Sequence, residues 1–252
     1  MNPYIQNLNR IEFLITLACT GRCKHCSEGE HVNCGDYIDG DIATQVVYQV
    51  AEKYNIQSLM TFGGEPLLRP EAVCKIQRAA LDCGIPKRQL ITNGFFSKDA
   101  KRIEAVAKEL AKSGVNAIAL SVDAFHQETI PLEPVKIFAK AVQAEGISLC
   151  THPAWLVSKE AENPYNQRTR EILEEFDLMG ITPSEGNVIF PGGNALKYLK
   201  EYFDLSQKQV SPYEENPEDV RAICIEPDGK VLGGNIYRTG IMDILAGYAP
   251  KK

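Results

Sequence analysis

The sequence predicts an α/β protein, a partial (β/α)6 barrel followed by a short C-terminal β-hairpin and helix. Four helix-like segments each end in a glycine that directly precedes a short apolar run, and glycine is the usual residue just past a helix end. These glycines recur every 30 to 34 residues, at Gly84, Gly114, Gly146 and Gly180. That period is the length of a strand, a loop and a helix, so we expect parallel strands in repeated βα units.

Apolar spacing defines the individual elements. Residues 98–113 and 166–179 carry apolar side chains at helical intervals and are expected to lie on a sheet. The predicted strands are residues 11–17, 58–62, 89–93, 117–122, 147–152 and 188–190. The predicted helices are residues 40–54, 70–83, 98–113, 133–145, 166–179 and 194–203. Together they make six βα units, two fewer than a closed barrel of eight.

The pattern changes after about residue 205. Residues 206–220 are polar and contain proline, which is typical of a loop or linker. Residues 222–234 (AICIEPDGKVLGG) predict two short strands paired around a Pro-Asp-Gly turn. We therefore divide the chain into a core at residues 1–204 and an extension at residues 205–252 that packs on it.

The composition excludes several classes of protein. The 252 residues are 44% hydrophobic and 24% charged, as in an ordinary globular domain. The net charge of -6 argues against a protein whose main role is to cover nucleic-acid phosphate or anionic lipid. No apolar run of 18 residues occurs, and the N-terminus lacks the basic-then-apolar order of a signal peptide. We therefore expect a cytoplasmic protein with no membrane partner.

Three of the eight cysteines, Cys19, Cys23 and Cys26, fall within eight residues. In a reducing compartment such clustering indicates metal or redox chemistry rather than disulfides. The spacing i, i+4, i+7 allows one loop to wrap three thiolates around an iron–sulfur cluster, and three ligands leave one iron open to a further ligand. The alternative from spacing alone is a zinc site made of these cysteines and one of His25, His31 or Cys34.

Chemically distinctive segments follow four successive predicted strands. Because the carboxyl ends of parallel strands meet at one rim, where α/β proteins carry their sites, we expect these segments to lie together. They are residues 19–26 after the first strand, 63–66 (GGEP) after the second, 92–94 (TNG) after the third and 121–123 (SVD) after the fourth.

The segment CTGRCKHC at residues 19–26 resembles the radical S-adenosylmethionine (SAM) signature, CxxxCxxC with an aromatic residue before the last cysteine. His25 takes that aromatic place, and the other rim segments match the family in order over roughly residues 8–200. The resemblance implies one [4Fe–4S] cluster per chain, held by Cys19, Cys23 and Cys26. It also implies that SAM is cleaved reductively to a 5′-deoxyadenosyl radical, with electrons from a donor such as a flavodoxin or ferredoxin.

The resemblance further assigns the contacts to SAM. The residues are Gly63, Gly64 and Glu65 for the methionine ammonium, Asn93 for the rest of the methionine, Ser121 and Asp123 for the ribose, and Val188, Ile189 and His25 for the adenine. The family's glycine-rich motif on the fifth strand is not visible in residues 147–155 (ISLCTHPAW).

The candidate substrate-side residues follow the fourth and fifth strands. Residues 125–128 (FHQE) are one group, and Cys150 and His152 share one face of the fifth strand by its two-residue period. If that face points into the barrel, Cys150 can donate a hydrogen atom to a substrate radical and His152 can move a proton. Cys224 is the other candidate donor. The alternative is a small buried cysteine and a hydrogen-bonded histidine.

Residues 225–245 resemble the C-terminal segment of SPASM-type extensions, but only Cys224, directly before them, is a cysteine, so no auxiliary cluster is expected. The tail and the cysteine loop lean toward a substrate that is a peptide or protein, over a small metabolite or nucleotide. An activase that installs a glycyl radical in another protein is a further alternative, and a non-catalytic zinc-binding scaffold is the alternative outside enzymes. No basic stripe supports a nucleic-acid substrate.

Overall fold

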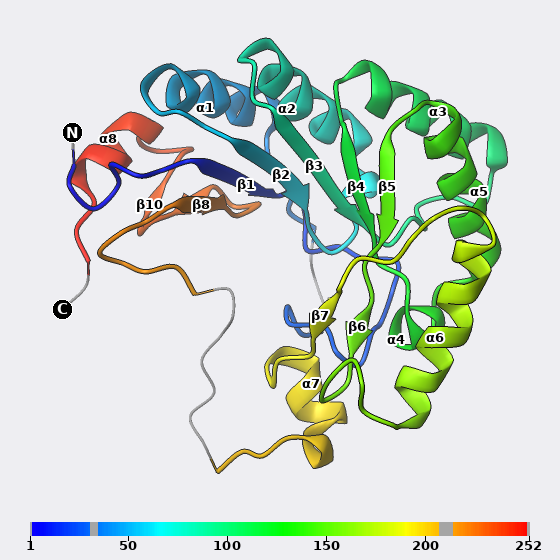
Figure 1. Cartoon of the computed structure of the whole chain (residues 1–252). Helices are drawn as coiled ribbons and strands as arrows, with labels where there is room; N and C mark the ends of the chain where they lie inside the picture. The colour runs from blue at the N-terminus through cyan, green and yellow to red at the C-terminus, as the bar shows by residue number, and fades with distance from the viewer. Residues whose placement is uncertain (1, 31–34, 207–213, 251–252) are drawn as a thin grey trace.

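The architecture is built on one parallel sheet, in a computed structural model that describes residues 2–30, 35–206 and 214–250. In that part of the chain the sheet has six strands in the order β5-β4-β3-β2-β1-β8 (Figure 1). The strands are β1 (Arg10–Leu14), β2 (Ser58–Phe62), β3 (Lys87–Thr92), β4 (Ala117–Leu120), β5 (Ser148–Thr151) and β8 (Ala222–Ile225). The six parallel strands and their helices confirm the predicted partial-barrel class.

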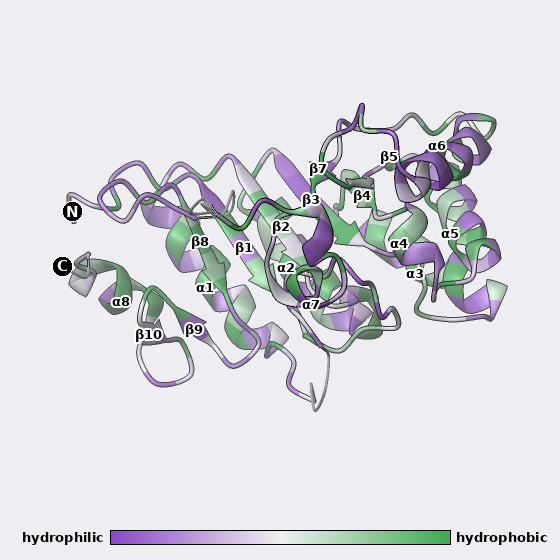
Figure 2. Cartoon of the chain, turned by 90° about the horizontal axis from the view of Figure 1, so that it is seen from below, coloured by the Kyte–Doolittle hydropathy of each residue, from purple (hydrophilic) through white to green (hydrophobic). Residues whose placement is uncertain are grey.

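Four helices cover one face of this sheet (Figure 1). They are α1 (Gly40–Lys53), α2 (Pro70–Asp82), α3 (Ala100–Lys112) and α5 (Leu132–Ala144). Asp39 and Asp99 cap the first and third of them by accepting hydrogen bonds from main-chain N–H groups. Figure 2 shows hydrophobic and hydrophilic residues alternating along α1 and α5, as expected of helices with one buried face. The four predicted capping glycines all have positive φ, which confirms these helix ends.

The two faces of the sheet differ in chemistry. On β1 and β8 the fully buried residues Ile11, Phe13, Ile223 and Ile225 belong to the core shared with the helices. The residues between them, such as Glu12, therefore point to the opposite, concave face. The register sets Glu12 beside Cys224 on that face.

The sixth strand differs from the prediction. The segment expected to supply it forms β7 (Asn187–Val188), which pairs with β6 (Ala154–Trp155) in a separate small sheet. Both residues of β7 are exposed, so this run offers no apolar face to the core. In β8 the alternating isoleucines do form an apolar face toward the core, and this strand pairs with β1 in parallel. The other described elements between β2 and β8 are three helices and two short 3-10 helices. They are α4 (Ala124–Gln127), α6 (Pro164–Asp177), α7 (Gly193–Tyr198), Pro66–Leu68 and Lys200–Tyr202.

The predicted C-terminal hairpin exists but is made by other residues. The strands β9 (Lys230–Val231) and β10 (Gly234–Asn235) are antiparallel, whereas β8 belongs to the main sheet and does not pair with β9. Leu232 and Gly233 both have positive φ, as a tight two-residue hairpin turn requires. The helix α8 (Ile241–Gly247) follows and packs near α1. The division at residue 204 stays a prediction. Of the helices described, none is both long and apolar enough to span a membrane.

Candidate functional site

The cysteine loop after β1 packs directly on the loop after β2. Gly64 N donates to Thr16 O at 2.7 Å, and Glu65 N donates to Ala18 O at 2.8 Å. A Cβ atom would lie 2.6 Å from Thr16 O at Gly63 and 2.4 Å from Ala18 O at Gly64. Any larger residue would therefore displace the backbone that carries the cysteines, so these glycines serve loop-to-loop contact.

Glu65 joins the loop after β2 to the loop after β3. Its carboxylate is fully buried and accepts hydrogen bonds from Leu67 N at 2.9 Å, Thr92 Oγ1 at 2.7 Å and Asn93 N at 2.9 Å. Burial raises the pKa of Glu65 to about 7, although these three hydrogen bonds act in the opposite direction. Its acceptor capacity is thus largely used within the protein.

Asn93 extends this network to the cysteines. It is 4% exposed, and its Nδ2 lies 3.5 Å from Cys19 Sγ and 3.2 Å from Thr20 Oγ1. Its Oδ1 accepts a hydrogen bond from Phe95 N, which fixes the amide orientation. The third rim segment therefore contacts a predicted cluster ligand, and Thr20 is a contact that the sequence did not reveal.

Asp123 is a second buried carboxylate, at the start of α4. Its Oδ1 accepts from His126 N at 2.9 Å, and its Oδ2 accepts from Ala154 N at 3.0 Å and lies 2.8 Å from His126 Nδ1. Burial disfavours both charges, but the mutual attraction prevails: it lowers the pKa of Asp123 and raises the pKa of His126 well above its ordinary value. Ser121, the other residue predicted for the ribose, is half-buried and donates from its backbone N to Thr92 O.

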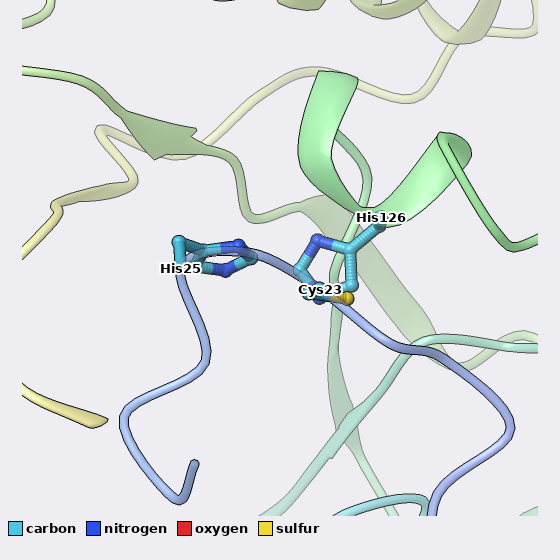
Figure 3. A group of neighbouring side chains, drawn as sticks. All are labelled: Cys23, His25 and His126. Carbon is cyan, nitrogen blue, oxygen red and sulfur yellow. The ribbon is translucent and has the colours of Figure 1, made fainter. Parts of the chain in front are cut away.

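His126 and His25 both lie beside Cys23. One ligand atom from each of these three residues lies within 4.8 Å of the others (Figure 3). The ring centroid of His25 is 4.9 Å from that of His126 and 5.1 Å from that of Phe125. Burial lowers the pKa of His25 to about 4. His126, expected on the substrate side, is therefore a neighbour of Cys23, a predicted cluster ligand.

The three cysteines come from one loop, as the ligands of a multi-iron cluster do. A turn closed by a hydrogen bond from Cys26 N to Cys23 O, at 3.2 Å, brings two of them to neighbouring positions. Gly21 N donates to Cys19 Sγ at 3.3 Å, a backbone hydrogen bond of the kind that a ligating sulfur receives. Burial raises the pKa of Cys19 to about 11 and also raises that of Cys26, so ligation must release protons.

Asn194, which the sequence reasoning missed, closes the other side of the cysteine loop. Its backbone N donates to Cys26 O at 2.9 Å and its Nδ2 donates to Cys23 O at 3.1 Å. A Cβ atom on Gly193 would lie 2.5 Å from Cys26 O, so α7 begins in direct contact with the loop. The Pro-Gly-Gly-Asn sequence at residues 191–194 was the available signal.

The remaining candidates lie apart from this network. Ile189 is buried and donates from N to Trp155 O, while Val188 is 50% exposed. His152 Nδ1 lies 2.8 Å from Ser184 Oγ, and Cys150 Sγ lies 3.8 Å from Ile118 O. The roles predicted for these residues and for Cys224 stay predictions. His31 and Cys34, named for the zinc alternative, lie outside the described residues.

A family model described as the radical SAM superfamily matches residues 13–148. Over 215 residues the chain is 29% identical to a probable GTP 3′,8-cyclase of Saccharolobus solfataricus, a match that covers 82% of this chain and 65% of that protein. A probable GTP 3′,8-cyclase of Methanocaldococcus jannaschii is 26% identical over 123 residues, which cover 49% of this chain and 39% of that protein. The match to the first relative therefore spans less than two thirds of its length.

Two solved structures share the fold. One is anSMEcpe with bound AdoMet, with a TM-score of 0.60 and 16% identity over 94% of this chain and 77% of that chain. The other is Streptococcus suis SuiB bound to the precursor peptide SuiA, with a TM-score of 0.61 and 14% identity over 95% of this chain and 64% of that chain. At these identities the likeness is one of fold.

Proposed function

The chain belongs to the radical SAM superfamily, and we propose on that premise that it is an enzyme that cleaves SAM reductively and abstracts a hydrogen atom from a bound substrate. The observation that carries the proposal is the set of buried contacts joining the cysteine loop to the loops after β2 and β3. Loops tied together in this way hold three thiolates in a fixed arrangement before any ligand arrives.

Cys19, Cys23 and Cys26 are the residues that would hold the [4Fe–4S] cluster, and the iron without a cysteine is where SAM would bind. When bound, the cluster supplies the electron that splits the sulfonium of SAM into methionine and a 5′-deoxyadenosyl radical. Asn93 contacts the Cys19 sulfur, and Asn194 holds the carbonyls of Cys23 and Cys26. These two amides position the loop that carries the predicted ligands.

The contacts to SAM are proposals as well. Because the Glu65 carboxylate is buried and already accepts three hydrogen bonds, we assign the methionine ammonium to main-chain oxygens of residues 63–65. The Asp123 oxygens are similarly engaged, so Ser121 is the better candidate for the ribose. His25, Val188 and Ile189 remain the candidates for the adenine.

We propose that the substrate is a small polar molecule, with a peptide as the second candidate. The relatives named as probable GTP 3′,8-cyclases favour a nucleotide or another small molecule. SuiB bound to its precursor peptide keeps a peptide substrate as the second candidate. The electron donor, the cytoplasmic location and the alternative of a glycyl-radical activase are untested predictions.

The test is anaerobic reconstitution of the full chain with iron and sulfide, followed by incubation with SAM and a strong reductant. We expect about four irons per chain, because only one three-cysteine loop is present, and release of 5′-deoxyadenosine. Cys23→Ser should abolish both, whereas the matched control Cys83→Ser, at the end of α2, should keep both. A colourless zinc protein that never yields 5′-deoxyadenosine would overturn the proposal. Stimulation of SAM cleavage by nucleoside triphosphates or by peptides then separates the two substrate classes.

A further inference from the structure

Cys23 belongs to a second group of possible metal ligands that excludes the other two cysteines. Its sulfur and one ring nitrogen from each of His25 and His126 all lie within 4.8 Å of one another. Figure 3 shows both rings turned toward Cys23, His25 from the cysteine loop and His126 from α4. Two elements that are distant in sequence thus converge on one buried thiol.

The ring nitrogens of His25 and His126 are placed as metal ligands would be. His126 Nδ1 is held by the Asp123 carboxylate at 2.8 Å, and the ring also forms a hydrogen bond with the Cys23 side chain, so its second nitrogen faces the sulfur. A carboxylate on the far nitrogen is the usual arrangement of a metal-binding histidine. His25 Nδ1 is buried and has no hydrogen-bond partner, although buried polar atoms nearly always have one.

We propose that Cys23, His25 and His126 bind one Zn²⁺ when the chain carries no iron–sulfur cluster. One thiolate and two imidazoles are ligands that zinc takes readily, with the fourth tetrahedral position left to water. Binding replaces the protons carried by the hydrogen-bonded Cys23–His126 pair with the metal and releases them to solvent. For zinc to bind, the donor atoms need to close from within 4.8 Å to roughly 3.5 Å of one another.

The surroundings of the group support a closed site. Phe125 contacts the His25 ring and stacks on Tyr165, with ring centroids 4.5 Å apart and planes at 13°. Cys23 is 7% exposed, and Asn194 holds its carbonyl oxygen at 3.1 Å. An apolar shell around a metal limits access of water and competing ligands.

The zinc site and the cluster are mutually exclusive because both need the Cys23 sulfur. This exclusion rests on the proposed function, whereas zinc binding itself does not. The cluster-free chain is then a zinc protein, and cluster assembly must displace the zinc ion. Free zinc should therefore slow the incorporation of iron.

Cobalt(II) is the probe, added to the full-length cluster-free protein under anaerobic conditions. We expect one equivalent to bind, with a thiolate-to-cobalt charge-transfer band and visible ligand-field bands, and Zn²⁺ to displace it. Cys26→Ser should keep this binding but lose the cluster. His126→Gln and His25→Gln should weaken cobalt binding at least tenfold but still incorporate about four irons.

His25→Gln is the cleaner variant because the Nδ1 of His25 has no hydrogen bond to lose. Circular dichroism checks that each variant is folded. If Cys26→Ser removes cobalt binding, the metal sits on the three cysteines and the proposal is wrong. Unchanged affinity in both histidine variants would also overturn it. Failure of the proposed function shows separately, as absence of 5′-deoxyadenosine from the reconstituted wild-type protein.

Discussion

The rim after β1, β2, β3 and β4 and the concave face at the sheet edges are organised in opposite ways. At the rim, Glu65, Asn93 and Asp123 are buried and bonded to neighbouring loops, so each fixes the position of another segment. On the concave face, Cys150 and Cys224 lie on β5 and β8, which are the two opposite edges of the described six-stranded sheet. The difference shows that contacts within the protein fix the rim loops, whereas a role of Cys150 and Cys224 toward a substrate stays a prediction.

The largest expected effect comes from removing one buried carboxylate of the rim. Glu65→Gln replaces an oxygen that accepts a hydrogen bond with an amide that donates one, facing Asn93 N, Leu67 N or Thr92 Oγ1. Leaving such buried groups unpaired should lower the free energy of unfolding by about 1–3 kcal/mol, measured by urea denaturation. The exposed control Glu104→Gln should change it by less than about 0.5 kcal/mol. If both variants lowered the free energy of unfolding equally, the buried rim carboxylate would contribute no more to stability than an exposed one, and the contrast between the rim and the concave face would not hold.

A smaller structural effect with a sharper chemical result is expected at the edge strand. Cys150 is half-buried and its sulfur makes a long contact of 3.8 Å with the Ile118 carbonyl, so Cys150→Ala should cost about 1 kcal/mol or less. If Cys150 donates the hydrogen atom, the variant should still release 5′-deoxyadenosine but form no final product. Cys224→Ala is the matched variant on the opposite edge. Normal product from Cys150→Ala, measured by mass spectrometry, would eliminate this role.

The smallest expected effect is a change in pH dependence at His152. Burial lowers the pKa of His152, so the folded protein holds this ring neutral while the unfolded chain protonates it near pH 6.5. The stability linked to this residue is therefore lost as the pH falls through about 6.5. Unfolding free energies at pH 7.5 and 5.5 should differ less in His152→Gln than in the wild type. An identical pH dependence in both proteins would show that the ring is accessible to solvent.

Features that depend on residues close together in the sequence were predicted, whereas features that depend on pairing between distant segments were missed. The cysteine loop and the glycines after the helices are written within a few residues, and the structure bears out the βα order they indicate. The placement of β8 beside β1 depends on which distant apolar run best covers an open edge, and no local pattern specifies that. The turn of His126 toward Cys23 likewise follows from Asp123 fixing its ring, which only the folded chain brings about.

The position of β8 has a consequence for biosynthesis. Among the described strands of the main sheet, β1 is translated before the others, and its outer edge is covered by β8, which is translated after them. Until that late segment emerges, the nascent sheet presents an uncovered row of main-chain donors and acceptors, which is a template for self-association. Asn2 then secures the finished arrangement, since its Nδ2 donates to Tyr248 O at 2.7 Å and to Leu245 O at 2.9 Å. The main sheet is thus completed by a non-local pairing, which joins the described strand that is translated first in this sheet to the one that is translated last.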